Sequence, residues 1–115
     1  MQNIKEKYDL KALERIKLRG DFATKTVWLN NKELSPEFCK SVYDHSSNGF
    51  NWGNSCPGSA QLALAILFEL TDDKRTSMIL HHVFKNEILV RLPASDFEIV
   101  VNLSDWLSKY INYII

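Results

Sequence analysis

The spacing of apolar residues changes several times along the chain, and the alternating stretches predict strands. Ile16 and Leu18 alternate with basic residues, as in a strand with one buried face. The pair Asn30-Asn31 suits a two-residue hairpin turn, because asparagine tolerates the left-handed backbone conformation. Apolar alternation and β-branched or aromatic residues define the predicted strands 15–19, 24–29, 32–34 and 97–102.

Helical patterns fill most of the remaining chain. Residues 60–70 are good helix formers and are apolar almost all the way round, which predicts a helix buried on most of its sides. Within it, Gln61 is the polar exception, and we expect it to hydrogen-bond the backbone of the preceding loop. The other predicted helices are a surface helix at 3–14, a short helix after Ser35-Pro36, a helix at about 74–91 and a terminal helix capped by Ser104.

These elements predict an α+β fold in one domain, residues 1–115. The expected architecture is a small, mostly antiparallel sheet with about four helices on one face and helix 60–70 at the centre. Residues 1–14 are expected to form an N-terminal extension or helix outside the main unit. At this length a hydrophobic core needs neither a disulfide nor a metal.

Charge and composition exclude several classes of protein. Fourteen Lys and Arg balance fourteen Asp and Glu, which argues against nucleic-acid binding, since affinity for that backbone comes mainly from cationic side chains. The N-terminus has no apolar signal core, and the longest apolar run, 62–68, is too short to span a membrane. We therefore expect a cytoplasmic protein in which Cys39 and Cys56 are reduced thiols.

Residues 44–59 form a long, glycine-rich segment that leads directly into helix 60–70. Glycines let backbone N–H groups converge, and a helix N-terminus is positive, so the pair could hold a phosphate or carboxylate. The spacing matches neither the Walker loop nor the dinucleotide fingerprint. Alternatively, the glycines only make turns, the aromatic residues pin the loop to the core, and Ser59 caps the helix. The candidate binding residues are His45, Phe50, Trp52, Gly53, Gly58, Ser59 and Gln61.

Two other chemistries are nucleophilic catalysis in this loop and metal binding on the helix at 74–91. A small hydrolase could use Cys56 or Ser59 as nucleophile with His45 as base, although no nucleophile signature is present. A metal site is not predicted, because the adjacent His81 and His82 point about 100° apart on a helix and the chain has no C-x-x-C pair. One of these two histidines is expected to face the core and the other water. No cofactor is predicted.

The loop and the helix after it resemble the core motif of a small, uncharacterised domain family of bacteria and their phages. The likeness covers about residues 15–107, and it implies that loop and helix are one signature unit and that the origin is bacterial, viral or a mobile element. It implies no activity. Cys56 departs from the family spacer, which makes it a poor family-wide nucleophile. The matching residues are Asp44-His45-Ser46, Gly49-Phe50-Asn51-Trp52-Gly53, Gly58-Ser59-Ala60-Gln61-Leu62-Ala63-Leu64-Ala65-Ile66-Leu67, Phe84-Lys85 and Leu92-Pro93.

The sequence thus favours a non-enzymatic binding or interaction domain, an accessory or inhibitor protein that recognises a small anionic ligand or a protein partner through loop 45–59. The hydrolase is one alternative. The other is a structural subunit that associates through an aromatic C-terminal helix bearing Trp106, Tyr110 and Ile114.

Overall fold

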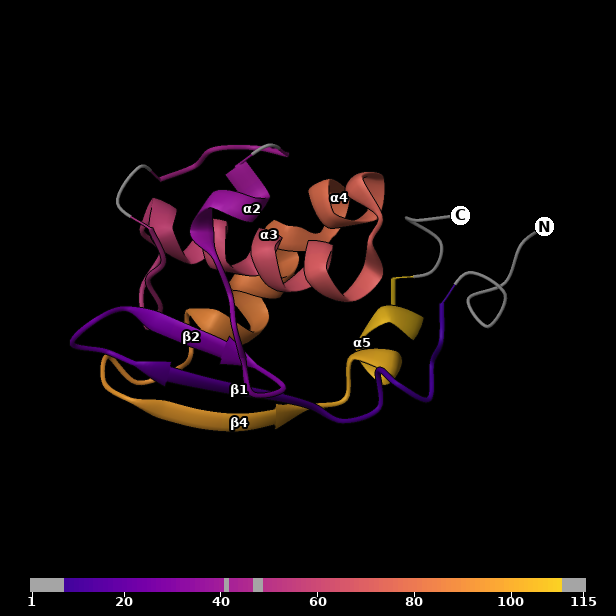
Figure 1. The fold of residues 1–115 in the computed structure, drawn as a ribbon. Helices are drawn as coiled ribbons and strands as arrows, with labels where there is room; N and C mark the ends of the chain where they lie inside the picture. Colours follow the sequence, from indigo (N-terminus) through magenta and orange to yellow (C-terminus); the bar gives the residue numbers. More distant parts are fainter. Residues whose placement is uncertain (1–7, 41, 47–48, 111–115) are drawn as a thin grey trace.

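The computed structural model describes residues 8–40, 42–46 and 49–110, and its sheet has four antiparallel strands in the order β3-β2-β1-β4 (Figure 1). The α+β class and the antiparallel sheet predicted from the sequence are confirmed. Asn30 and Asn31 have positive φ angles of 50° and 69°, as the predicted hairpin turn requires. The strands are β1 (Ile16–Asp21), β2 (Thr26–Leu29), β3 (Lys32–Glu33) and β4 (Phe97–Val101).

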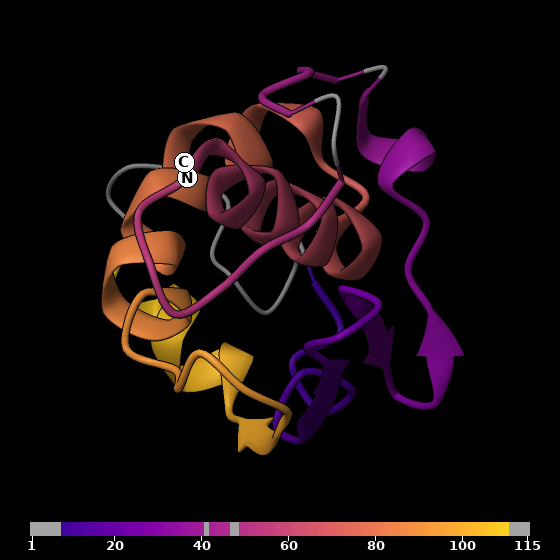
Figure 2. The same ribbon diagram turned by 90° about the vertical axis from the view of Figure 1, so that its left-hand side faces the viewer.

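The helices lie on one side of the sheet, with α3 between α2 and α4 (Figure 2). A π-helix, η1, continues α4 without a break. Among the described residues no helix combines the length and the apolar character needed to cross a bilayer. The helices are α2 (Pro36–Lys40), α3 (Pro57–Thr71), α4 (Lys74–Phe84), η1 (Lys85–Leu89) and α5 (Leu103–Ser108).

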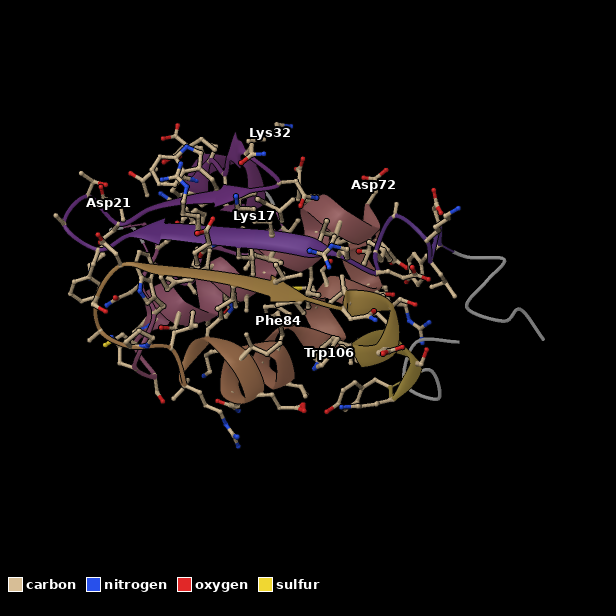
Figure 3. The ribbon with its side chains drawn as sticks, turned by 90° about the horizontal axis from the view of Figure 1, so that it is seen from below. Lys17, Asp21, Lys32, Asp72, Phe84 and Trp106 are labelled. Carbon is tan, nitrogen blue, oxygen red and sulfur yellow. The ribbon has the colours of Figure 1, made fainter. Side chains whose placement is uncertain are left out.

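One face of the sheet contributes apolar side chains to the core. Leu18 of β1 is paired with Leu29 of β2 and Ile99 of β4, so that apolar side chains line up across three strands. The opposite face carries charged side chains beside Trp28 and the exposed Val100, and there Lys17 forms an ion pair with Glu98 at 2.9 Å. Figure 3 shows β2, β1 and β4 next to one another, and Phe84 of α4 beside Trp106 of α5. The inward face therefore lies against α3 and α4, as its alternation predicts.

Helix α3 occupies the centre of the core, as predicted. Its residues from Gly58 to Leu67 are all buried, because the sheet covers one side and the other helices cover the rest. The helix begins at Pro57, three residues before the predicted start. Cys56 has an extended backbone and Pro57 opens the first turn, a position that proline tolerates well.

Several predicted boundaries are wrong. Residues 8–14 form turns instead of the second half of a surface helix, and residues 3–7 of that prediction lie outside the described part of the chain. The terminal helix is capped by Asn102 instead of Ser104, and its predicted residues 111–114 are also outside the description. The predicted count of about four helices is not matched. In the described residues only α3 and α4 exceed two turns, and the predicted helix 74–91 becomes π-helical at Lys85.

Candidate functional site

Gln61 anchors the first half of the 45–59 loop to helix α3. Its side chain is fully buried, and its Oε1 accepts hydrogen bonds from the backbone N–H groups of His45 at 2.5 Å and Ser46 at 3.2 Å. Its Nε2 donates to the carbonyl oxygen of Tyr43 at 3.0 Å. The predicted bond between Gln61 and the loop backbone is thus confirmed. One side chain of α3 therefore fixes the position of the His45 backbone, and with it the direction in which the His45 side chain projects.

Trp52 anchors the second half of the loop from the core side. It is fully buried, and its indole N–H donates to the carbonyl oxygen of Ser95 at 2.9 Å. Its ring meets Phe22 and Phe97 edge-on, with centroid distances of 5.7 and 5.1 Å. These contacts make Trp52 a support for the loop that a ligand outside the core cannot reach.

The glycines of the loop serve two different needs. Gly49 and Gly53 have φ angles of +87° and +74°, which side chains rarely adopt. Gly53 also lies against the 92–94 backbone, and its N–H donates to the carbonyl oxygen of Leu89 at 2.9 Å. Gly58 lies in the first turn of α3, and a Cβ added there would stand 2.9 Å from the Cβ of Asn51. Gly58 is therefore required for close packing and not for its backbone angle.

A pocket of about 460 Å³, here called the loop pocket, opens where this loop meets the start of α3. Three of the predicted site residues line it: His45, Phe50 and Gly58. Lys25 at the end of the β1–β2 turn also lines it, and the sequence analysis did not identify this residue. The other predicted residues lie outside the lining, namely Trp52, Gly53, Ser59 and Gln61.

The start of α3 makes the loop pocket electropositive. Cys56 caps the helix without a side-chain hydrogen bond, and the first turn has no acidic residue. The expected Ser59 cap is wrong, since its buried hydroxyl donates to Oδ1 of Asn54 at 3.3 Å. Of the described residues that line the pocket none is acidic, and Lys25 adds a cation. Both the helix end and Lys25, whose ammonium lies over the ring of Phe22, therefore favour an anion in this pocket.

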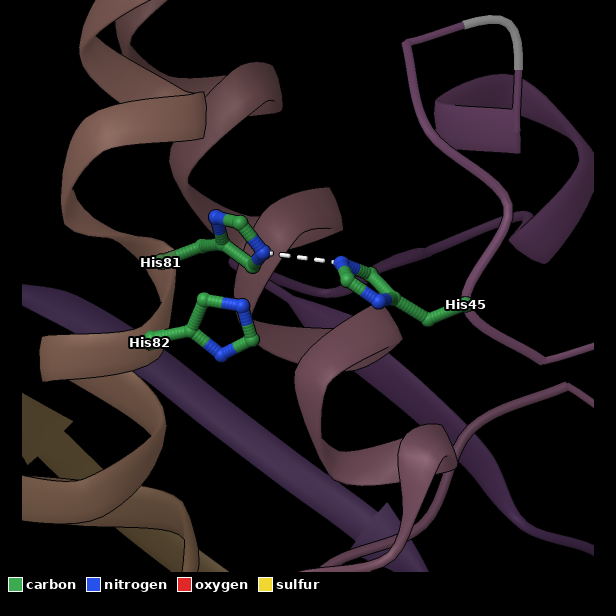
Figure 4. A group of neighbouring side chains, drawn as sticks. All are labelled: His45, His81 and His82. Atoms are coloured by element: carbon green, nitrogen blue, oxygen red, sulfur yellow. Dashed lines mark hydrogen bonds between the residues drawn. The ribbon is translucent and has the colours of Figure 1, made fainter.

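Next to the loop pocket, three imidazole rings meet between the loop and helix α4, and we call them the histidine cluster: His45, His81 and His82 (Figure 4). The Nε2 atoms of His45 and His81 are 2.8 Å apart and share a hydrogen bond. The rings of His81 and His82 have centroids 4.1 Å apart, so the inference that these neighbours diverge is wrong. His81 is buried and His82 is exposed, which confirms that one faces the core and the other water.

The histidine cluster is electrically neutral near pH 7. Burial, followed by the nearby His82, lowers the pKa of His81 to about 4. Burial also lowers the pKa of His45 and of His82, and Lys85 lowers both further. Asp44 acts in the opposite direction on the pKa of His45. Neutral imidazoles keep a lone pair, so the cluster can accept a proton or hold a metal ion.

The architecture and the site define a small α+β domain in which a loop–helix unit carries a pocket and a histidine cluster. Residues 18–109 match DUF6166, a family of unknown function. The chain belongs to this family. No curated protein and no solved structure matches the chain.

Proposed function

We propose that this protein is a non-enzymatic binding domain whose loop pocket captures a small anionic ligand. The observation that carries the proposal is the pairing of Lys25 with the uncapped start of α3 in one pocket. A cation and a helix N-terminus attract phosphate and carboxylate groups, and backbone N–H groups add directional hydrogen bonds. His45, in the same lining, has its Nε2–H engaged by Nε2 of His81, so its Nδ1 can accept a hydrogen bond from a hydroxyl group of the ligand.

The size of the loop pocket supports a ligand no larger than a mononucleotide. About 460 Å³ lies in the lower part of the range typical of small-molecule sites. Phe50 belongs to the lining and is almost fully buried, so it can form a floor against which part of a ring rests. In this proposal the protein acts as an accessory or inhibitor protein by binding its ligand or a protein partner. It is cytoplasmic and comes from a bacterium, a phage or a mobile element. Location and origin remain predictions.

Calorimetric titration with inorganic phosphate and with 5′-AMP tests this proposal. We compare the wild type with Lys25→Asn, because asparagine tolerates the positive φ of 57° at this position. The matched control is Lys32→Asn, which removes an exposed lysine of the neighbouring hairpin that pairs with Glu69.

The wild type and Lys32→Asn should bind 5′-AMP alike, and the affinity should fall with added salt. Lys25→Asn should weaken binding by about fivefold or more, as expected for the loss of a charged hydrogen bond. Saturable binding that is the same in Lys25→Asn as in the wild type would contradict the proposed site, as would the absence of binding to both anions.

The small hydrolase remains the second candidate, because exposed Cys56 and His45 line the same pocket. The double variant Cys39→Ser/Cys56→Ser separates the two functions. Under the binding proposal it should fold and bind 5′-AMP like the wild type. If the variant keeps its circular dichroism spectrum but no longer acts on 5′-AMP as the wild type does, the result would instead favour the thiol as nucleophile.

The third candidate, a structural subunit, requires an apolar surface on the C-terminal helix. Trp106 is only 6% exposed and packs edge-on against Phe84 at 5.3 Å, so it contributes to the core. Tyr110 is half-buried and donates a hydrogen bond to Glu87, and Ile114 lies outside the described residues. These contacts give the interface hypothesis less support than the loop pocket gives to binding.

A further inference from the structure

The histidine cluster gathers every histidine of the chain at one point. The protein has three histidines in all, and they come from the loop at position 45 and from adjacent positions of α4. One ring nitrogen from each lies within 4.8 Å of the others. We propose that His45, His81 and His82 bind a divalent transition-metal ion of the zinc type, with a fourth position open to water. This inference does not depend on the loop pocket binding an anion.

The hydrogen bonds of His81 place its lone pair where a metal ion needs it. Its Nδ1 lies 3.1 Å from the carbonyl oxygen of Ser77 and 3.0 Å from that of Met78. Carbonyl oxygens only accept, so Nδ1 carries the proton and Nε2 presents its lone pair toward His45 (Figure 4). Metal-binding histidines are held in the same way, by a carbonyl or carboxylate on the nitrogen that does not bind the ion.

Without metal, the Nε2–H of His45 donates to the Nε2 of His81. A metal ion replaces this shared proton, which moves to Nδ1 of His45, so both Nε2 lone pairs turn to the ion. The ring of His45 remains neutral in both states. Because Gln61 holds the His45 backbone, the loop presents this ring to α4 before any ion arrives.

The separations of the nitrogens fit a zinc site after small side-chain movements. Zinc–nitrogen bonds of about 2.0–2.1 Å in a tetrahedron place the nitrogens about 3.3 Å apart. The His45–His81 pair at 2.8 Å must open by about 0.5 Å, and the widest pair, at most 4.8 Å, must close by about 1.5 Å. His81 is fixed by its backbone contacts, whereas the exposed ring of His82 can rotate toward it.

Two charged side chains act on the cluster from different elements. Lys85 of η1 lies close enough to lower the pKa of His45 and His82, and it opposes a bound cation. Asp44 of the loop favours a cation. Imidazole nitrogens are preferred ligands of Zn²⁺, Co²⁺, Ni²⁺ and Cu²⁺ and poor ligands of Mg²⁺ and Ca²⁺, which sets the class of metal.

Cobalt titration of the chelator-treated full chain tests the proposal. Co²⁺ reports its ligands by visible absorption, and Zn²⁺ is then added in competition. The background is Cys39→Ser/Cys56→Ser, so that no thiolate contributes. We expect one Co²⁺ per chain, a four-coordinate visible spectrum, and its loss on addition of Zn²⁺.

His82→Ala is the decisive variant, because His82 is exposed and its removal leaves the core intact. It should weaken metal binding at least tenfold. Lys85→Gln should tighten binding, on the order of fivefold, because it removes a repelling charge. Absence of saturable Co²⁺ binding would overturn the proposal. So would unchanged binding in His82→Ala, since the ion would then lie elsewhere.

Discussion

Replacing Gln61 with Leu is expected to release the 45–59 loop from helix α3. The change keeps a buried side chain of similar size but removes the hydrogen bonds that Gln61 makes with Tyr43, His45 and Ser46. Each is worth about 1 kcal/mol net. The free energy of unfolding should therefore fall by about 3 kcal/mol, which corresponds to a melting temperature lower by about 10 °C.

Urea denaturation gives the stability, and hydrogen exchange gives the position of the loop. In the wild type the amides of His45 and Ser46 should be protected, and in Gln61→Leu both should exchange at least tenfold faster. Leu64→Ala is the control, and the core cavity that it leaves should lower the free energy of unfolding by about 2–5 kcal/mol. In this variant the two loop amides should exchange faster only to the extent that global unfolding becomes easier. A loss below about 1 kcal/mol with protected loop amides in Gln61→Leu would refute the anchoring role.

Two further predictions concern backbone strain and acid. Gly53→Ala should destabilise more than Gly49→Ala in urea melts, because both have positive φ but only Gly53 also has backbone atoms 3.1 Å from an added Cβ; equal losses would argue against crowding. In chelator-treated protein, the folded-state pKa of His81 is depressed to about 4, below its unfolded value of 6.5. Its stability contribution, about 3 kcal/mol, is therefore present above pH 6.5 and lost as the pH falls toward 4. Unchanged stability across that range would contradict the burial of a neutral His81.

The strands and the central helix could be predicted from local sequence patterns, because the apolar residues that make each pattern are the ones that the fold buries. Leu18 and Ile99 lie in stretches of alternating pattern and pair across the sheet, so the two-residue period of the sequence matches the buried face of the strands. The near-continuous apolar run of α3 left burial as the only stable outcome. Gln61 could be read as a loop anchor because a lone buried amide needs partners.

The histidine cluster and Lys25 were missed for a different reason. Adjacent positions on a helix diverge at Cβ, but imidazole rings are long enough to turn back, and His45 reaches them only through the folded loop. Lys25 joins the loop pocket through tertiary packing of the β1–β2 turn. The signal that could have suggested the cluster is the scarcity of histidine: three in the chain, one of them in the long loop.

The most direct test of the account is a paired measurement on His45→Ala, in which thermal stability and 5′-AMP binding are compared with the wild type. His45 is half-buried and its backbone bond to Gln61 survives the change, so water from the pocket can replace it beside His81. We predict a stability loss of no more than about 1 kcal/mol together with 5′-AMP binding that is weakened by about fivefold or more. A large fall in melting temperature with unchanged binding per folded molecule would contradict the account and make the loop a folding motif.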